Sequence, residues 1–351
     1  MIKKIFFILL VSFCLSGCNK QKTLGTQSSD DTVSFTDSGG RTVDIPSNIT
    51  AVIPSGALTQ MFIVAIAPDV LVTNSSAASK ERDEFMPHSV LGLPFVGQVF
   101  GTRDFNYEEA AKMGAQIVID CGDPFPKIAD DMEGITEKLG IPSIHITAKL
   151  SSTPQAFRTL GKVLKREEKA EALALFCEKT INHLNDVVEK TGGKKVSALY
   201  CMGREGLNVL SAGTIHSEVL DAITDNKAVV DNPASRGSGN EANMEQINLW
   251  NPQVILFAQT SIYDDAANRA EWKELDAIKN KRYYKVPDLP YNWMGSPPSI
   301  NRFLSMLWLC SILYPQYTDY DLYTEVKEYY KLFYAYELTK EKFDEITYGA
   351  L

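Results

Sequence analysis

Two stretches of the sequence follow one pattern: NYEEAAKMGAQIVID at residues 106–120 and NMEQINLWNPQVILF at residues 243–257. Each has an Asn, a Glu two places on, a short half-apolar helix and then an apolar run typical of a strand. Three pairs of positions are identical, namely Asn106 and Asn243, Glu108 and Glu245, and Gln116 and Gln253. A similarity at one large spacing, with no shorter period, predicts two related halves and not a solenoid array.

Short apolar runs alternate with helical stretches on both sides of this repeat. Such alternation predicts βαβ units and a mostly parallel central sheet flanked by helices in each half. In the first half the runs lie at 50–56, 70–76, 95–101, 116–123 and 143–148, and in the second at 196–203, 253–260 and 283–290. The predicted fold class is therefore α/β with two lobes.

A long stretch rich in Ala, Leu, Glu and Lys separates the two halves. Leu173, Phe176, Cys177 and Leu184 follow one helical face, and a helix of some twenty residues spans roughly 30 Å, enough to link two lobes. We expect an N-terminal lobe at 34–150, one long linking helix at 151–192, a C-terminal lobe at 193–316, and C-terminal helices packed on the lobes at 317–351.

The first residues form a targeting signal, because MIKKIFFILLVSFCLSGCNK has a basic start, a short apolar stretch and small residues at its end. Its end, Leu15 to Cys18, resembles the bacterial lipobox, which predicts a lipoprotein signal peptide at 1–17 and a lipid such as palmitate on Cys18. The alternative is an ordinary signal peptide with an incidental cysteine. Residues 18–33 are polar and predict a flexible tether.

Charge and cysteine content exclude several classes of function. The formal net charge is -9, and removal of the signal with Lys3 and Lys4 makes the chain more acidic, so a nucleic-acid partner is not expected. The remaining cysteines have no CxxC or zinc-site spacing, and we interpret them as small buried side chains in preference to disulfides. They are Cys121, Cys177, Cys201 and Cys310.

These features together resemble the solute-binding lipoproteins of ABC importers, in the cluster that serves cobalamin, haem and iron-siderophore complexes. The segments that carry the resemblance are 37–56, the two Asn-x-Glu repeats and 293–315. The resemblance implies a class III periplasmic binding protein with a rigid single-helix hinge. It also implies that Glu108 and Glu245 pair with arginines of a membrane permease dimer, whereas the alternative is that both are plain helix-capping acids.

The expected ligand site lies beyond the carboxyl ends of the strands, as in other doubly wound sheets. The loops there offer planar cationic donors, aromatic rings and small polar residues, which suit a bulky anionic chelate. The candidate ligand-binding residues are Ser55, Gly56, Gln98, Phe100, Asp123, Arg204, Arg236, Tyr263, Tyr291 and Trp293. Arg302 is interpreted as a structural residue that ties the tail to the lobe.

A metal chelate, with a ferric siderophore favoured, is therefore the predicted small-molecule partner, and no resident cofactor is expected. Haem is an alternative ligand, because Tyr263, Met202 and Met294 are side chains that could serve as its axial ligands. Cobalamin and an oxyanion such as molybdate or tungstate, held by backbone N–H groups in a nest, are further alternatives. The histidines are scattered, so a bare metal site is not expected. They are His88, His145, His183 and His216.

Catalytic motifs do not fit the sequence, which contains no G-x-S-x-G, H-E-x-x-H or G-x-x-x-x-G-K-[ST] pattern. We therefore predict a binding protein that is not an enzyme. An exported hydrolase and a surface lipoprotein that binds a partner without a transporter are the weaker alternatives, and the second leaves the paired glutamates unexplained.

Overall fold

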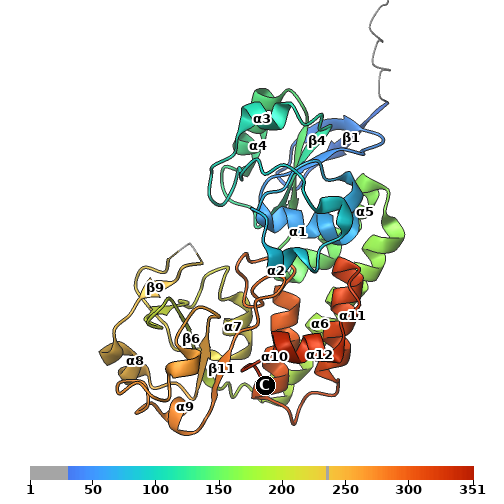
Figure 1. Ribbon diagram of the computed structural model, residues 1–351. Coiled ribbons are helices and arrows are strands. Elements are labelled where there is room, and N and C mark those ends of the chain that lie inside the picture. Colours follow the sequence, from blue (N-terminus) through green and yellow to red (C-terminus); the bar gives the residue numbers. More distant parts are fainter. Residues whose placement is uncertain (1–30, 235–236) are drawn as a thin grey trace, which may run out of the picture.

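The computed structural model describes residues 31–234 and 237–351, which form two lobes stacked against a bundle of helices (Figure 1). The predicted signal peptide, Cys18, most of the predicted tether and Arg236 lie outside the described residues. The tether prediction is wrong at its end, because β1 already begins at Thr32. Within the described residues, no helix has the length and apolar character needed to cross a membrane.

The N-terminal lobe contains a parallel sheet in the order β3-β4-β5 and a separate β1-β2 hairpin. The predicted strands at 70–76 and 95–101 are reduced to isolated bridges, Val52 with Leu71 and Asn74 with Phe95. The strands of this lobe are β1 (Thr32–Thr36), β2 (Thr42–Pro46), β3 (Val52–Pro54), β4 (Ile117–Gly122) and β5 (Ser143–Thr147). Its helices are α1 (Ala57–Ile66), η1 (Pro68–Val70), α2 (Lys80–Asp83), η2 (His88–Val90), α3 (Tyr107–Ala111), α4 (Ile128–Leu139) and η3 (Leu150–Ser152).

The C-terminal lobe repeats this plan around a mixed sheet in the order β11-β10-β6-β7-β9, with β8 also paired to β6. Strand β10 lies parallel to β6 and β11, whereas β7 runs antiparallel to β6. The strands are β6 (Ser197–Met202), β7 (Asn208–Val209), β8 (Asp225–Asn226), β9 (Asn240–Glu241), β10 (Val254–Phe257) and β11 (Tyr283–Lys285). The helices are α7 (Glu218–Ile223), α8 (Met244–Trp250), η4 (Tyr263–Asp265) and α9 (Asp276–Lys279).

A long linking helix is present as α6 (Glu167–Lys190), but its predicted bounds of 151–192 are wrong, because the first part of that segment forms a separate helix, α5 (Thr153–Leu164). Lys165 takes a left-handed conformation with φ of 54° and ends α5. Gly161 makes the close packing of the two helices feasible, since a Cβ there would lie 2.5 Å from the Cβ of Ala170. Only α6 continues toward the second lobe, and α5 packs against β5 and α1 of the first.

The C-terminal segment forms α10 (Arg302–Leu313), α11 (Leu322–Tyr334) and α12 (Lys340–Ile346). Helix α10 packs on α6 and α7, and α11 packs on α1, α6 and α10. Aromatic rings join these helices: Phe333 of α11 contacts Phe157 of α5 and Phe176 of α6, with centroid distances of 5.9 and 5.6 Å. The tail therefore connects the N-terminal lobe to the helix that links the lobes (Figure 1).

Buried side chains divide into one large core and two smaller ones. The large core is continuous through one face of each sheet and through α1, α5, α6, α10 and α11. Since successive strand residues point to opposite faces, Ala198 and Tyr200 join this core while Leu199 and Cys201 join a smaller core under α8 and α9. A matching small core in the first lobe lies under α3 and α4 and receives Ile53 and Val118. The two lobes thus share an interior.

All four cysteines in the described residues are free and buried, as the sequence predicted. Burial raises the pKa of each of these thiols. A thiol with a raised pKa in an apolar interior is a poor nucleophile and a poor metal ligand. The cysteines therefore serve packing.

Candidate ligand cleft and docking surface

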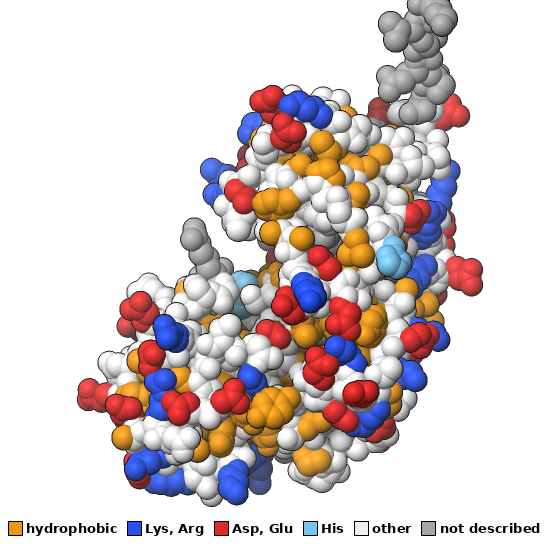
Figure 2. Space-filling view, viewed as in Figure 1, with side chains coloured by type: hydrophobic (Ala, Val, Ile, Leu, Met, Phe, Trp, Pro, Cys, Tyr) orange, Lys and Arg blue, Asp and Glu red, His pale blue; other side chains and the backbone are white. Residues whose placement is uncertain are grey.

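The cleft lies between the two lobes, where Figure 2 shows the surface hollowed. On the N-terminal side, the loop after β3 meets the loop at 98–101. The carbonyl oxygen of Ser55 accepts hydrogen bonds from the backbone N–H groups of Val99 at 2.8 Å and Phe100 at 3.3 Å. Gly56 packs tightly here, since a Cβ would lie 3.0 Å from the Phe100 carbonyl oxygen. Four of the predicted residues, Ser55, Gly56, Gln98 and Phe100, are thus brought together.

A buried network of polar side chains fixes the loop after β3. The Ser55 hydroxyl lies within hydrogen-bond distance of a carboxylate oxygen of Asp120 and 2.9 Å from the Thr59 hydroxyl. The other oxygen of Asp120 lies 2.6 Å from Nδ1 of His145. Because Ser55 is 1% exposed and these partners engage its hydroxyl, its side chain positions the loop and does not point into the cleft.

An aromatic edge and a carboxylate lie beside this loop. Phe100 meets Phe125 edge to face at a centroid distance of 5.5 Å, and Phe125 is 37% exposed. Oδ1 of Asp123 is buried and has no hydrogen-bond partner among the described residues. Buried carboxylate oxygens nearly always find a donor, so Asp123 is suited to receive one from outside the chain.

The opposite wall of the cleft carries a desolvated ion pair. Arg302, 2% exposed at the start of α10, places Nη1 2.5 Å from a carboxylate oxygen of Glu218 at the start of α7. Burial raises the pKa of the Glu218 carboxyl; Arg302 opposes this rise, and the negative charge of Asp123 adds to it. Asp123 of the first lobe therefore faces the Arg302–Glu218 pair of the second. Arg302 ties α10 to the lobe, consistent with its structural interpretation, but it also supplies cleft charge.

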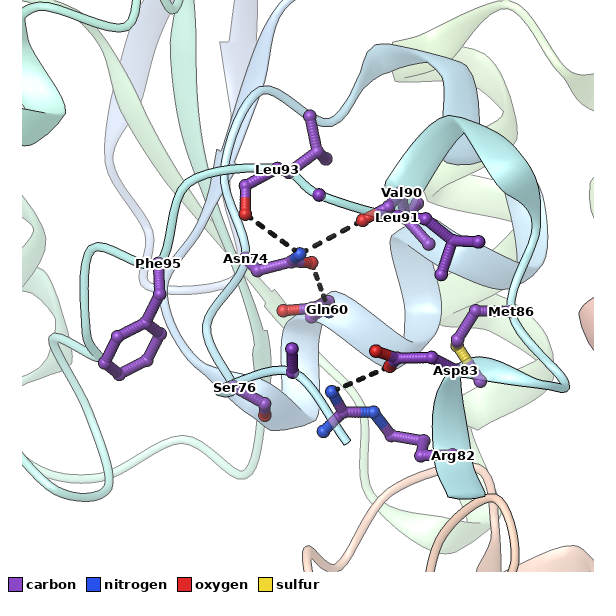
Figure 3. Close-up of a pocket in the computed structure, with 12 residues that line it drawn as sticks. Gln60, Asn74, Ser76, Arg82, Asp83, Met86, Val90, Leu91, Leu93 and Phe95 are labelled. Carbon is purple, nitrogen blue, oxygen red and sulfur yellow. Dashed lines mark hydrogen bonds and ion pairs between the residues drawn. The ribbon is translucent and has the colours of Figure 1, made fainter. Parts of the chain in front are cut away.

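A small cavity of about 140 Å³ enters the N-terminal lobe beneath the loops at 74–78 and 90–95 (Figure 3). Asn74 holds these loops, because its side-chain amide donates to the carbonyl oxygens of Val90 and Leu93 at 3.0 and 3.3 Å. Leu91 and Phe95 supply exposed apolar lining. Arg82 and Asp83 add an ion pair, with 3.1 Å between Nη2 and Oδ1, and Arg82 also donates to the Ala77 carbonyl oxygen at 2.6 Å.

Arg82 also reaches the predicted residue Tyr291. Its guanidinium carbon lies 5.9 Å from the centroid of the Tyr291 ring, so the cavity adjoins the connection between the lobes. Burial raises the pKa of the Tyr291 hydroxyl, which therefore stays protonated at neutral pH. Sequence reasoning missed Arg82, because the polar run SSAASKERD around it has no pattern that separates a lining arginine from a solvated one.

The other predicted residues of the C-terminal lobe take different places. Arg204 is exposed in the loop after β6, and Arg236 lies outside the described residues. Trp293 is fully buried, donates to the Leu289 carbonyl oxygen at 3.2 Å and meets Trp308 edge to face, so it is a core residue in this conformation. Tyr263 packs against Tyr283 and the C-terminal turn, where a Cβ on Gly349 would overlap its ring.

Residues 31–234 and 237–351 contain no group of three or more His, Cys, Asp or Glu side chains placed to hold a metal ion. His145 is paired with Asp120, and Nδ1 of His216 lies 2.9 Å from the Gly295 carbonyl oxygen. His183 lies 3.5 Å from Asp319 on the outer side of α6. These side chains are separate from one another and act within local contacts.

The repeated stretches occupy equivalent positions in the two lobes. Asn106 caps α3 by accepting from the Glu109 N–H at 3.1 Å, and Asn243 caps α8 by accepting from the Gln246 N–H at 2.9 Å. The repeated glutamine also has one role in both lobes: its side-chain oxygen accepts from a backbone N–H just before the neighbouring strand. These bonds are 2.7 Å from Thr50 to Gln116 and 3.0 Å from Ser197 to Gln253.

Glu108 and Glu245 both lie on the surface, in the first turn of α3 and α8. In Figure 1 these helices lie at the outer parts of the two lobes, on the side of the molecule away from α6. Figure 2 shows acidic side chains over α3 and at the end of the lobe that carries α8. Each lobe thus presents one equivalent acid beyond its small core.

Two α/β lobes, a shared core along a linking helix and a cleft between the lobes define a bilobal binding protein. Residues 130–289 match a family model described as periplasmic binding protein. No curated protein sequence matches the chain. Proteins of the matched family are solute-binding proteins of transport systems outside the cytoplasm, and not enzymes.

Solved structures share the complete fold. An ABC transporter solute-binding protein from Sulfurospirillum deleyianum matches with a TM-score of 0.80 and 26% identity, over 89% of this chain and 98% of that chain. A periplasmic solute-binding protein from Veillonella parvula matches with a TM-score of 0.73 and 24% identity, over 90% and 97%. The molybdate-binding protein MolA from Haemophilus influenzae matches with a TM-score of 0.68 and 18% identity, over 88% and 99%. The predicted fold class is confirmed.

Proposed function

We propose that this chain is the extracytoplasmic solute-binding component of an ABC importer and that it captures a metal chelate between its lobes. A ferric siderophore is the favoured ligand. The observation that carries the proposal is the cleft itself: a bilobal fold in which Asp123 of one lobe faces the Arg302–Glu218 pair of the other.

The lining favours a bulky anionic chelate over a bare ion. Arg82 and Arg204 provide fixed positive charge on the two lobes, and Phe100 with Phe125 provides an aromatic edge. Planar guanidinium groups match carboxylate and catecholate oxygens, and rings pack on flat ligand faces. The proposed ligand-binding residues are therefore Gly56, Gln98, Phe100, Asp123, Arg204 and Tyr291, which the sequence predicted, together with Arg82.

An oxyanion is the second candidate, because a relative of the same fold was solved with molybdate bound. A ligand of that size needs several donors within one small volume. In the described part of the chain the cationic side chains of Arg82, Arg204 and Arg302 belong to separate segments. This separation suits a larger ligand better.

Ligand identity is tested by thermal unfolding of the mature chain with ferric catecholate and hydroxamate siderophores, haem, cobalamin and molybdate. We expect a ferric siderophore to stabilise the fold by about 2.7 kcal/mol at a concentration 100 times its dissociation constant. A shift with molybdate alone would replace the siderophore proposal with the oxyanion. No shift with any transported ligand class, in a chain shown to be folded, would count against the binding role.

Two further parts of the proposal concern the membrane. Glu108 and Glu245 dock on the permease, and a lipid on Cys18 anchors the chain to the membrane. Glu108→Arg combined with Glu245→Arg is expected to abolish uptake with ligand affinity kept, whereas Glu168→Arg with Glu341→Arg, an equal charge change elsewhere, keeps uptake. Cys18→Ala is expected to release the chain from the membrane fraction and to end labelling by a palmitate analogue.

A further inference from the structure

The repeat that aligns the two docking acids also aligns the residues four places after them. Glu108 is followed at that offset by Lys112, and Glu245 by Leu249. Side chains four residues apart lie on the same face of a helix. The two lobes therefore place different side chains next to equivalent acids.

In the N-terminal lobe the acid, Glu108, forms an ion pair with Lys112. Nζ of Lys112 lies 3.2 Å from Oε1 of Glu108 and 2.8 Å from Oε1 of Glu109. The hydrogen bonds that Lys112 donates to Glu109 and then to Glu108 raise the pKa of its ammonium group. A basic side chain that approaches Glu108 must share or displace Lys112.

In the C-terminal lobe the equivalent acid, Glu245, has no cationic partner among the described residues. Glu245 forms no ion pair with any residue in 31–234 or 237–351, and its neighbour Gln246 is engaged in the capping box of α8. Leu249 is 83% exposed, more than any other large apolar side chain of the described residues. Helix α8 therefore presents an unpaired carboxylate beside an apolar side chain.

We infer that docking is asymmetric: the C-terminal lobe, through Glu245 and Leu249, contributes more of the affinity for the permease than the N-terminal lobe. This inference rests on the proposed function. The occupant of the α8 surface is the extracytoplasmic face of an ABC permease subunit, which would offer a basic side chain to Glu245 and an apolar surface to Leu249. The charge of Glu245 fits the first feature and the exposure of Leu249 fits the second.

The relative size of the two contributions follows from the groups involved. An exposed ion pair between helix residues four positions apart is weak, so displacing Lys112 from Glu108 is expected to lower the affinity for the permease by about twofold. Burial of a leucine side chain in an interface shifts it by about 10-fold or more. The asymmetry therefore depends mainly on Leu249 and secondarily on the missing cation beside Glu245.

The test measures binding of the mature, ligand-loaded chain to its permease–ATPase complex in nanodiscs. Glu245→Gln is expected to weaken binding about twofold more than Glu108→Gln, because only Glu108 has a cation that the permease must displace, and Leu249→Lys to weaken it about 10-fold or more. Lys112→Leu is expected to strengthen binding about twofold or more, because it removes the competing cation and places an apolar side chain beside Glu108. All four positions are exposed, and unchanged ligand affinity and melting temperature verify the fold of each variant.

The double variant Lys112→Leu with Leu249→Lys is the most discriminating test, because it exchanges the two side chains between the lobes and is expected to move the asymmetry to the N-terminal lobe. In that background Glu108→Gln is expected to become the more damaging change. Equal losses for Glu108→Gln and Glu245→Gln in both backgrounds would overturn the asymmetry and leave docking intact. Unaltered binding after the double charge reversal at Glu108 and Glu245 would instead overturn the docking proposal itself.

Discussion

Replacement of Glu218 by glutamine tests how the cleft carries its charge. Burial raises the pKa of this carboxyl, Arg302 and Lys149 oppose the rise, and Asp123 adds to it. Since the folded pKa exceeds the unfolded one, the stabilising contribution of Glu218 is present below its unfolded pKa and is lost as pH rises through its folded pKa. At neutral pH the ionised carboxylate therefore stabilises the fold less than a neutral group of the same shape.

The structure separates charge from hydrogen bonding at this position. Glutamine keeps an oxygen for Nη1 of Arg302, which lies 2.5 Å from the present carboxylate, whereas alanine leaves a 2% exposed guanidinium without that acceptor. The bond from Nε to the Ser299 carbonyl oxygen at 3.2 Å remains in both variants. We expect Glu218→Gln to leave the free energy of unfolding at pH 7 unchanged or slightly raised, and Glu218→Ala to lower it by about 1–3 kcal/mol.

Urea unfolding of both variants between pH 5 and pH 8 measures these differences. The advantage of Glu218→Gln over the wild-type chain is expected to shrink as pH falls, because wild-type Glu218 then becomes protonated. Glu337→Ala is the control, since it removes an exposed partner of Lys331 and is expected to change the free energy of unfolding by less than about 0.5 kcal/mol. Equal destabilisation by Gln and Ala would show that the charge pair is net stabilising and refute the reasoning.

Three further predictions concern other parts of the molecule. Arg82→Met is expected to weaken binding of an anionic ligand about tenfold in titration calorimetry, while Arg166→Met, at an exposed ion pair away from the cavity, leaves it unchanged. Gly161→Val is expected to lower the free energy of unfolding by about 1–3 kcal/mol, because α5 and α6 have no room for its side chain. Thiol reagents are expected to modify the native mature chain, freed of Cys18, only on the time scale of unfolding, and rapid native labelling would contradict the buried placement of Cys121, Cys177, Cys201 and Cys310.

The duplicated architecture could be predicted from the sequence because it depends on local signals. An asparagine before a helix and a glutamine before a strand act on backbone groups a few residues away or at the start of a neighbouring strand. Each signal occurs twice at the same offset, so coincidence is a poor explanation. The two-lobed α/β fold and the surface position of Glu108 and Glu245 follow from these local patterns.

The break between α5 and α6 could not be predicted in the same way. Lys165 has no special tendency toward a positive φ, and the apolar periodicity continues across it. The left-handed turn is stabilised by tertiary contacts that the local sequence does not reveal. One of these is Arg158, which forms ion pairs with Glu171 and Glu178 of α6.

The ligand residues were the least predictable, because a loop position does not determine where a side chain points. Trp293 follows a predicted strand-end loop but enters the core, where its indole meets Trp308. Arg82 lies in a polar run with no motif, yet it lines the cavity and reaches Tyr291. The contact between Arg82 and Tyr291 joins positions 209 residues apart (291 − 82), and single-sequence patterns do not encode such a contact.

The arrangement of the cores explains how ligand and permease contacts can be linked. Each helix that carries a proposed docking acid rests on the small core of its own lobe, α3 with Ala110 and α8 with Ile247, and therefore moves with that lobe. The ligand cleft lies between the lobes, whose angle is restrained by the large shared core and by the Phe157, Phe176 and Phe333 contacts. The separation of Glu108 and Glu245 is consequently a function of the angle between the lobes. Because close-packed interiors resist deformation, a ligand can change that separation only slightly, and a permease with two basic contacts at fixed spacing would respond to that small change.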